Sequence, residues 1–309
     1  MNFTKSIFIF LVIAGLGACA PKVGKETTTA AGGSGDFRDT APQAGPARPV
    51  EIGQSHQFTL ANGLKVIVVE NHKLPQISYQ LTINRDEILE KEKSGLSGMA
   101  GSLLATGTTT KTKAEIDEAV DYIGGSLSTS GTGGFASSLT KHSDKILGLF
   151  SDVILKPSFP EAEFEKIKTQ TLSGLQTEKD DPNAISGNVS SALTYGKEHP
   201  YGEITNESTV SNINLDDCKA YYNTYFKPGT AYLVIVGDIT PETAKAKAEK
   251  YFGSWAAGTT PKYTYAFPKG VDKTTVAFVD KPGAVQSVIN ITYAVDLKPG
   301  AADILPARV

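Results

Sequence analysis

The sequence predicts an α+β fold in which a mostly antiparallel sheet is covered by helices on one side. Three observations predict it: short alternating apolar segments typical of strands, longer segments with helical periodicity, and turn residues between them. Of the 309 residues, 40% are hydrophobic and 20% are charged, so most of the chain can bury a core. A net charge of −3 argues against nucleic-acid partners, and no interior apolar run approaches the length of a membrane span.

The N-terminus has the pattern of an export signal. Lys5 precedes the apolar stretch 7–13, which is too short to cross a bilayer, and Leu-Gly-Ala then leads into Cys19. This ending resembles the bacterial lipobox, in which cleavage leaves the cysteine to carry the lipid. The alternative is an ordinary signal peptide followed by a chance cysteine, which we consider the weaker interpretation because the chain has only two cysteines.

We therefore expect a lipoprotein signal peptide over residues 1–18 and lipid attachment at Cys19. Residues 19–53 are rich in Gly, Ala, Thr and Pro, a composition typical of a disordered tether. Ala20 replaces the aspartate that commonly retains lipoproteins at an inner membrane. The expected location is the cell envelope, lipid-anchored at the outer membrane and facing the periplasm.

Residues 54–260 alternate between strand and helix patterns and are expected to form the first domain. Asn62-Gly63 between two apolar segments predicts a hairpin, and Thr112 with Glu115 predicts a helical capping box. The remaining elements follow from periodicity and from Gly and Pro boundaries. The expected strands are 57–60, 64–70, 77–83, a hairpin within 127–140, and 231–236; the expected helices are 95–104, 112–123, 143–155, 161–178 and 240–252.

A weak internal repeat suggests a second domain. At an offset of 210 residues, Val66 and Leu81 correspond to Val276 and Ile291. Chance matches between strand-like segments are common, so the repeat is only suggestive by itself. If it is real, residues 261–309 begin a second, homologous domain that is truncated. Such a fragment would pack loosely or lean on the first domain, because its sheet edges would be unpaired.

Several short motifs occur in a fixed order along residues 54–309. They are Leu60-x-Asn-Gly-Leu64, Gly95-Leu-Ser, Gly107-Thr108, Phe164 to Asp181-Pro182, His199-Pro-Tyr-Gly202, Tyr222 to Pro228, Val236-Gly237-Asp238 and Phe252-x-x-Trp255. The ordered set resembles the insulinase/pitrilysin-type zinc metallopeptidases, which include the mitochondrial processing peptidases. The resemblance implies this family's two-domain repeat of α+β domains.

The resemblance also implies a zinc site, which this chain lacks. Members carry an H-x-x-E-H helix, whose histidines share one helical face, and a distant glutamate as third ligand. The intervening glutamate acts as the general base on zinc-bound water. Here the two histidine positions hold Gly98 and Ser102, the base position holds Gly101, and the distant glutamate position holds Gly174. We expect no catalytic residue, no bound metal and no other cofactor, although zinc is expected for the family.

Other side chains do not replace the missing ligands. The four histidines, His56, His72, His142 and His199, include no pair at helical ligand spacing. Glu178, one helical turn beyond Gly174, is expected to be a solvated carboxylate. Cys218 lies on a helix-like stretch and is expected to be buried rather than reactive.

The small residues Gly98, Gly101 and Ser102 lie opposite the apolar face of their predicted helix. We favour the interpretation that the space for the metal has closed by small-residue packing against the helix that contains Gly174. The alternative is a smooth chamber wall along which a peptide slides.

The main functional hypothesis is a non-catalytic subunit of an insulinase-like peptidase. It would contribute chamber wall and peptide binding to an active H-x-x-E-H partner as a heterodimer in the cell envelope. One alternative is an envelope module that binds peptides or proteins through an exposed strand edge, without a proteolytic role. A third, less favoured, is an active metalloendopeptidase with atypical ligands. Inactive members of the family typically supply an Arg/Tyr pair that would lie beyond Val309, so no such residue is assigned.

Overall fold

The computed structural model describes residues 45–46, 54–268, 273–292, 295, 297–298, 300–304 and 307. The predicted signal peptide, Cys19 and almost all of the predicted tether lie outside the described residues. From residue 54 onward the described residues belong to one unit, which spans residues 52–309. None of the helices in these ranges combines the length and apolarity that crossing a bilayer would need.

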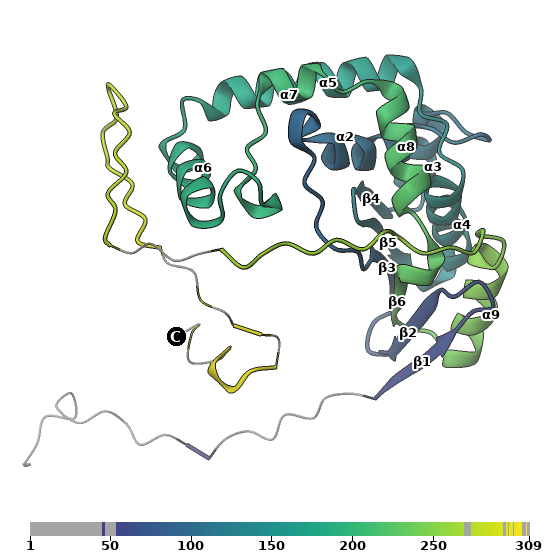
Figure 1. Ribbon diagram of the computed structural model, residues 1–309. Helices are drawn as coiled ribbons and strands as arrows, with labels where there is room; N and C mark the ends of the chain where they lie inside the picture. Colours follow the sequence, from purple (N-terminus) through teal and green to yellow (C-terminus); the bar gives the residue numbers. More distant parts are fainter. Residues whose placement is uncertain are drawn as a thin grey trace, which may run out of the picture. The chain divides into compact units, whose positions relative to one another are not determined.

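Six strands form one sheet in the order β1-β2-β6-β3-β5-β4 (Figure 1). All neighbouring pairs are antiparallel except β2 with β6. The sequence-based prediction of a mostly antiparallel α+β fold is therefore confirmed. The strands are β1 (Ser55–Thr59), β2 (Lys65–Glu70), β3 (Gln76–Ile83), β4 (Ser126–Ser130), β5 (Gly133–Leu139) and β6 (Ala231–Gly237).

In the four central strands, β2, β6, β3 and β5, the buried residues lie mainly on one face of the sheet. Val66, Leu81 and Leu233 lie side by side in neighbouring strands and are each 0% exposed. The residues between them along each strand are half-buried or exposed. Because side chains alternate between the two faces of a strand, this pattern places the core on one side, where the helices pack.

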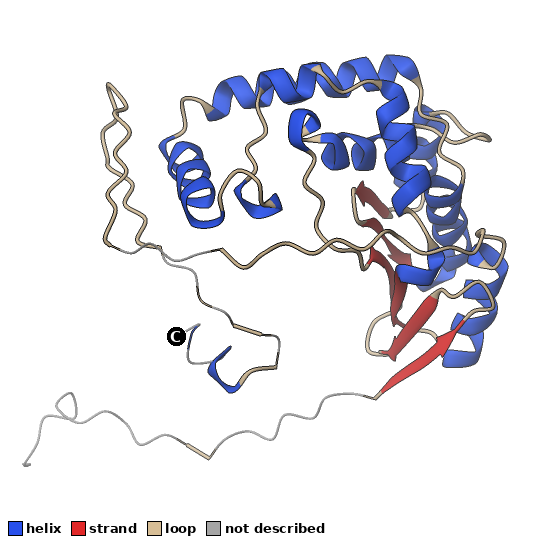
Figure 2. Cartoon of the chain, in the orientation of Figure 1, coloured by secondary structure: helices blue, strands red, loops and turns tan. Residues whose placement is uncertain are grey.

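The five predicted helices are present, with each end within one residue of the predicted range, and Figure 2 shows the helices in relation to the strands. The helices Pro182–Tyr195 and Glu207–Ser211 were not predicted, and Leu215–Tyr225 was predicted only as a helix-like stretch around Cys218. The capping box of Thr112 and Glu115 is present at the start of α3. The helices are α2 (Leu96–Leu103), α3 (Lys113–Tyr122), α4 (Ser143–Leu155), α5 (Glu161–Glu178), α6 (Pro182–Tyr195), α7 (Glu207–Ser211), α8 (Leu215–Tyr225) and α9 (Pro241–Phe252). Short 3₁₀ helices cover Lys91–Lys93, Leu104–Thr106, Thr140–His142, Pro200–Gly202, Pro228–Thr230 and Ala302–Ile304.

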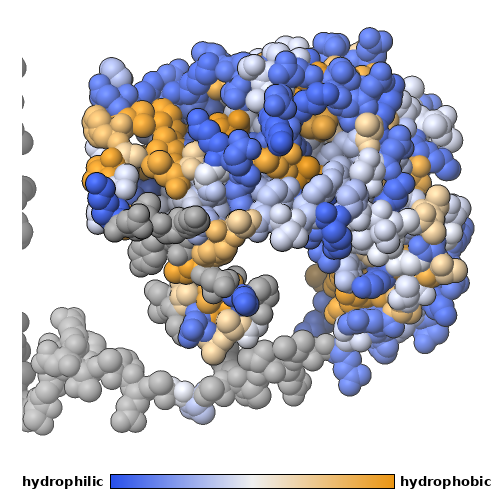
Figure 3. All heavy atoms as spheres, viewed as in Figure 1, coloured by the Kyte–Doolittle hydropathy of each residue, from blue (hydrophilic) through white to orange (hydrophobic). Residues whose placement is uncertain are grey.

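Helix α6 differs from the others because none of its residues is buried. It begins at Pro182 with Asp181 as its N-cap. Figure 3 shows apolar side chains on the surface over α6, where Leu193 is 57% exposed. The helix was not predicted, although Ile185, Val189 and Leu193 recur at helical spacing in the sequence.

Beyond α9, the described residues from 261 to 292 form neither helix nor strand. The strands that the 210-residue repeat predicts around Val276 and Ile291 are absent there, and both side chains are 86% exposed. Apolar alternation forms a sheet only through a hydrogen-bonded strand partner, and the described residues of this segment make no such pairing. The segment contacts the rest of the unit through side chains, as between Asn290 and Ser186 at 2.8 Å. The assignment of 261–309 to a second domain stays a prediction.

Candidate functional site

Helix α2, which carries three of the four zinc-site positions, is capped by a carboxylate. Gly95 begins it with φ of 104°, a conformation that glycine adopts without strain. The Glu90 carboxylate accepts hydrogen bonds from the backbone N–H groups of Gly95 and Ser97, each at 2.8 Å. These donors would otherwise be unpaired at the helix start, where negative charge is also favoured.

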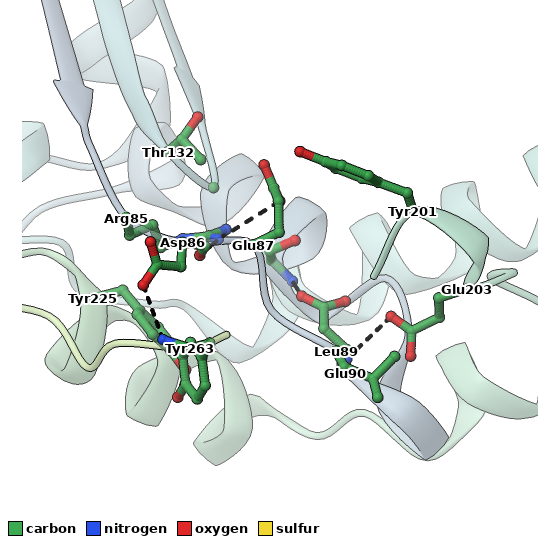
Figure 4. Close-up of polar contacts among 12 residues, drawn as sticks. Arg85, Asp86, Glu87, Leu89, Glu90, Thr132, Tyr201, Glu203, Tyr225 and Tyr263 are labelled. Carbon is green, nitrogen blue, oxygen red and sulfur yellow. Dashed lines mark hydrogen bonds and ion pairs between the residues drawn. The ribbon is translucent and has the colours of Figure 1, made fainter. Parts of the chain in front are cut away.

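A second carboxylate holds the segment that carries Glu90. Figure 4 shows Glu203 beside residues 89–90, and its carboxylate accepts hydrogen bonds from the N–H groups of Glu90, at 3.0 Å, and Lys91. Burial raises the pKa of the Glu203 carboxyl, while these two donors oppose the rise. The two glutamates together fix the start of α2 relative to the chain that follows α6.

The zinc-site positions on α2 do not share one environment. Met99, Ala100 and Leu103 form the buried face, as the sequence predicts. Gly98 and Ser102 are exposed, and the Ser102 hydroxyl donates to the Gly98 carbonyl at 3.0 Å. The two histidine positions therefore lie on an open helical surface.

Gly101, the general-base position, is buried against main chain. A Cβ added at this residue would overlap the backbone of Ser130 and Gly131, in the turn between β4 and β5. A Cβ added at Gly131 would in turn lie 2.5 Å from the carbonyl oxygen of Ser97 in α2. Only the absence of side chains at both glycines allows the turn and the helix to approach this closely.

The favoured sequence interpretation, closure of small residues against the helix around Gly174, is wrong in two respects. A Cβ added at Gly98 or at Gly174 would meet no heavy atom within 4 Å. The backbone that packs closely against α2 is instead that of the β4–β5 turn. Sequence periodicity could not predict this contact, because it indicates elements but not which of them touch. The alternative of a smooth, open wall agrees with the exposure of Gly98, Ser102 and Gly174.

Gly174 lines a pocket of about 440 Å³. The pocket is bounded by α5, by α6 and by the chain after it, through Thr171, Gly174, Leu175, Glu178, Asn188, Glu203 and Thr205. Glu178 is exposed, as predicted for a solvated carboxylate. The Glu203 carboxylate is already engaged by two backbone donors.

The side chains at these positions do not fit a zinc ion. Three glycines and one serine offer none of the imidazole, thiolate or carboxylate donors that protein zinc sites use. Within residues 54–268 and the other described ranges, no group of three or more His, Cys, Asp or Glu side chains is arranged to hold a metal. The described residues therefore offer no atypical ligand set of the kind that the active-metalloendopeptidase alternative would need. Cys218 is buried, and burial raises the pKa of its thiol to about 12, which agrees with a structural role.

The histidines have separate local roles. His72 lies 2.7 Å from Asp238 and 3.1 Å from Glu70 through its two ring nitrogens. His199 accepts a hydrogen bond from the Tyr201 N–H at 3.2 Å, within the His-Pro-Tyr-Gly turn. These contacts stabilise loops and turns and do not bring the imidazoles together at α2.

Beside the open face of α2 lies an unpaired strand edge. β4 is the last strand of the sheet and pairs only with β5. None of its residues makes another backbone–backbone hydrogen bond within the described residues. Alternate N–H and C=O groups of an edge strand face outward and can pair with an added strand. The side chains on one face of β4, Ser126, Ser128 and Ser130, are small and exposed.

Comparisons with known proteins agree with this architecture. Residues 65–203 match the family described as Insulinase (Peptidase family M16), and residues 212–307 match the Peptidase M16 inactive domain. The chain is 27% identical over 207 residues to an uncharacterized zinc protease of Bacillus subtilis, covering 65% of this chain and 50% of that protein. It is 23% identical over 217 residues to the mitochondrial-processing peptidase subunit beta of Caenorhabditis elegans, covering 68% and 47%. The chain thus spans about half the length of these relatives.

Solved structures show the same fold. A peptidase M16 inactive domain from Pseudomonas fluorescens superposes with a TM-score of 0.63 at 22% identity, covering 70% of this chain and 54% of that one. A protease from Helicobacter pylori superposes with a TM-score of 0.58 at 24% identity, covering 71% and 53%.

Proposed function

Because the chain belongs to the insulinase family of peptidases, family M16, we propose that it is a non-catalytic, peptide-binding subunit of a zinc peptidase. It contributes chamber wall and peptide binding to an active H-x-x-E-H partner. The observation that carries the proposal is the retained scaffold with Gly98, Gly101, Ser102 and Gly174 at the zinc-site positions. Such a chain can hold a peptide but cannot ionise a zinc-bound water.

The β4 edge supplies the peptide-binding surface in this proposal. An extended peptide pairs its backbone with the outward-facing groups of Ser126–Ser130 and forms a seventh strand. The open face of α2 at Gly98 and Ser102 leaves room beside this edge for the peptide's side chains. Main-chain pairing is largely independent of sequence, which suits a subunit that receives many peptides.

The proposed location is the cell envelope. It rests on the lipobox-like sequence that ends at Cys19 and on the composition of residues 19–53. A lipid at Cys19 anchors the protein at the outer membrane, facing the periplasm, and the partner is exported to the same compartment. Labelling with a radioactive fatty acid and its loss in Cys19→Ala test this part separately.

The test of the main proposal is reconstitution with an H-x-x-E-H homologue copurified with the full chain from membranes. We expect the chain alone to hold no stoichiometric zinc and to cleave no peptide, and the partner to gain activity when the chain is added. A partner whose base glutamate is changed to glutamine is the matched control and should remain inactive. One tightly bound zinc per chain, or chelator-sensitive cleavage by the chain alone, would overturn the proposal.

A second candidate is a peptide- or protein-binding module of the envelope with no proteolytic role. The unpaired β4 edge favours it equally, because edge pairing requires no catalytic partner. Peptide binding by the purified chain, together with no gain in any homologue's peptidase activity, distinguishes it from the subunit.

A further inference from the structure

The turn between β4 and β5 is held from two sides. On one side it packs against α2, where the glycine backbones at 101 and 131 allow main-chain contact. On the other side the Ile83 N–H donates to the Thr132 carbonyl at 2.7 Å. β4 ends at Ser130, so any movement of this turn moves the end of the free edge.

A third contact comes from the buried hydroxyl of Tyr221 in α8. It donates to the Gly131 carbonyl at 2.7 Å, and it accepts a hydrogen bond from Arg85 Nη2 at 2.8 Å. A guanidinium has no acceptor, so the hydroxyl proton is directed at Gly131. Tyr221 is 3% exposed, which shields this hydrogen bond from water.

Arg85 is itself held in one orientation. Its side chain is 5% exposed, and Nη1 donates to the Asp86 carbonyl at 2.9 Å. The guanidinium lies over the rings of Tyr221 and Tyr225, 5.8 and 5.5 Å from their centroids. Its nearest carboxylate partner among the described residues is Glu87, drawn beside it in Figure 4, with 3.9 Å between Nη1 and Oε2. At that distance the ion pair is weaker than the contacts with the aromatic rings and the Tyr221 hydroxyl.

We propose that Tyr221 is a positioning residue for peptide binding, which fixes the end of the β4 edge through the Gly131 carbonyl and is itself oriented by Arg85. This role rests on the proposed function, since it assumes that a peptide pairs with β4. Ordering the edge before binding lowers the entropy cost of adding a strand. Loss of the hydroxyl therefore weakens the bound state without removing any atom that touches the peptide.

The neighbouring residue provides a matched control. The Tyr222 hydroxyl also donates to a backbone carbonyl, that of Ile154 at 2.8 Å, but at the end of α4. Tyr221→Phe and Tyr222→Phe thus each remove one buried hydroxyl from the same helix. Only the first removes a contact to the β4–β5 turn.

The experiment measures binding of a fluorescein-labelled peptide, selected on the wild-type chain from a random library, by fluorescence anisotropy and stopped flow. We expect Tyr221→Phe to raise the Kd about tenfold, mainly through faster dissociation, and Tyr222→Phe to change it less than about twofold. Arg85→Lys keeps the positive charge but loses the several N–H donors of the guanidinium, so it should raise the Kd as Tyr221→Phe does. Equal affinities for the two Phe variants would overturn the role of Tyr221.

Hydrogen exchange separates this role from the proposed function. Amides within residues 126–133 should exchange faster in Tyr221→Phe than in Tyr222→Phe, at matched global stability. If the wild-type chain binds no peptide, the proposed function fails, and the exchange contrast alone decides whether Tyr221 holds the turn. Equal exchange in both variants would refute that as well.

Discussion

Two alanine substitutions in α2 should have opposite effects on stability. Gly98 is exposed, and an added Cβ would meet no heavy atom within 4 Å. Alanine costs less conformational entropy than glycine inside a helix, so Gly98→Ala should stabilise the protein by about 0.5–1 kcal/mol. Gly174→Ala in α5 is equally unobstructed and should act in the same direction.

Gly101→Ala gains the same stabilisation from the higher helix propensity of alanine, but it places a methyl group where neighbouring backbone atoms already lie. The atoms it would overlap belong to the backbone of Ser130 and Gly131, which cannot rotate away as a side chain would. Overpacking of a well-packed interior costs roughly 1–3 kcal/mol, and a backbone obstacle places this site at the upper end. After the helical gain, the net destabilisation should be about 1–2 kcal/mol.

The assay is urea unfolding of the purified chain, followed by circular dichroism, with the midpoint and slope fitted separately. Gly98→Ala and Gly101→Ala should differ by about 1.5–3 kcal/mol in unfolding free energy, with unchanged slopes. If Gly101→Ala is as stable as Gly98→Ala, the β4–β5 turn does not occupy the space of the base, and the reasoning about the site fails.

Three further predictions follow from single contacts. Gly98→His with Ser102→His places two imidazoles one turn apart on the open face of α2, so the double variant should bind Zn²⁺ in calorimetry but cleave no peptide. Hydrogen bonds to Asp238 and then Glu70 raise the pKa of His72. The stabilisation from these contacts is therefore complete below about pH 6.5 and is lost as the pH rises through the folded-state pKa. His72→Gln should flatten the dependence of unfolding free energy on pH in that range, and an unchanged dependence would contradict this. Thr112→Ala removes the N-cap of α3 and should cost about 1 kcal/mol in urea unfolding. Thr109→Ala is the control, because Thr109 is exposed and the substitution leaves that cap intact.

The fold was predictable where local signals were strong. α4 spans Ser143–Leu155, the range that its sequence periodicity predicts, because Phe150 and Val153 recur at helical spacing and both are 0% exposed. α6 was missed although Asp181-Pro182 is a sound helix start, because the same dipeptide also reads as the end of α5. The alternation near Val276 predicted strands that the described residues do not form, since propensity alone supplies no pairing partner.

The site was predictable in its chemistry but not in its packing. The replacement of zinc donors follows from the positions of Gly98, Gly101, Ser102 and Gly174 in the sequence alone. The surroundings of these residues could not be predicted from the sequence. The contact between Gly101 and Gly131 joins segments 30 residues apart and depends on how the edge of the sheet packs against α2. The only local signal was the run of Ser and Gly around Gly131, which indicates a turn without indicating what it touches.

The absence of metal ligands at positions 98 and 102 and the absence of room for a side chain at position 101 are separate features of this molecule. Gly98 and Ser102 are exposed, so we expect histidines introduced at both positions to bind metal. Gly101 is different, because the turn that fills its side-chain space is the same turn that Tyr221 holds against α2. A glutamate can act at position 101 only if this turn moves, and moving it displaces the end of the β4 edge. The β4 edge, at which we propose that peptides bind, and the absent base are therefore coupled through one turn, and introducing a functional base at position 101 should weaken that proposed binding.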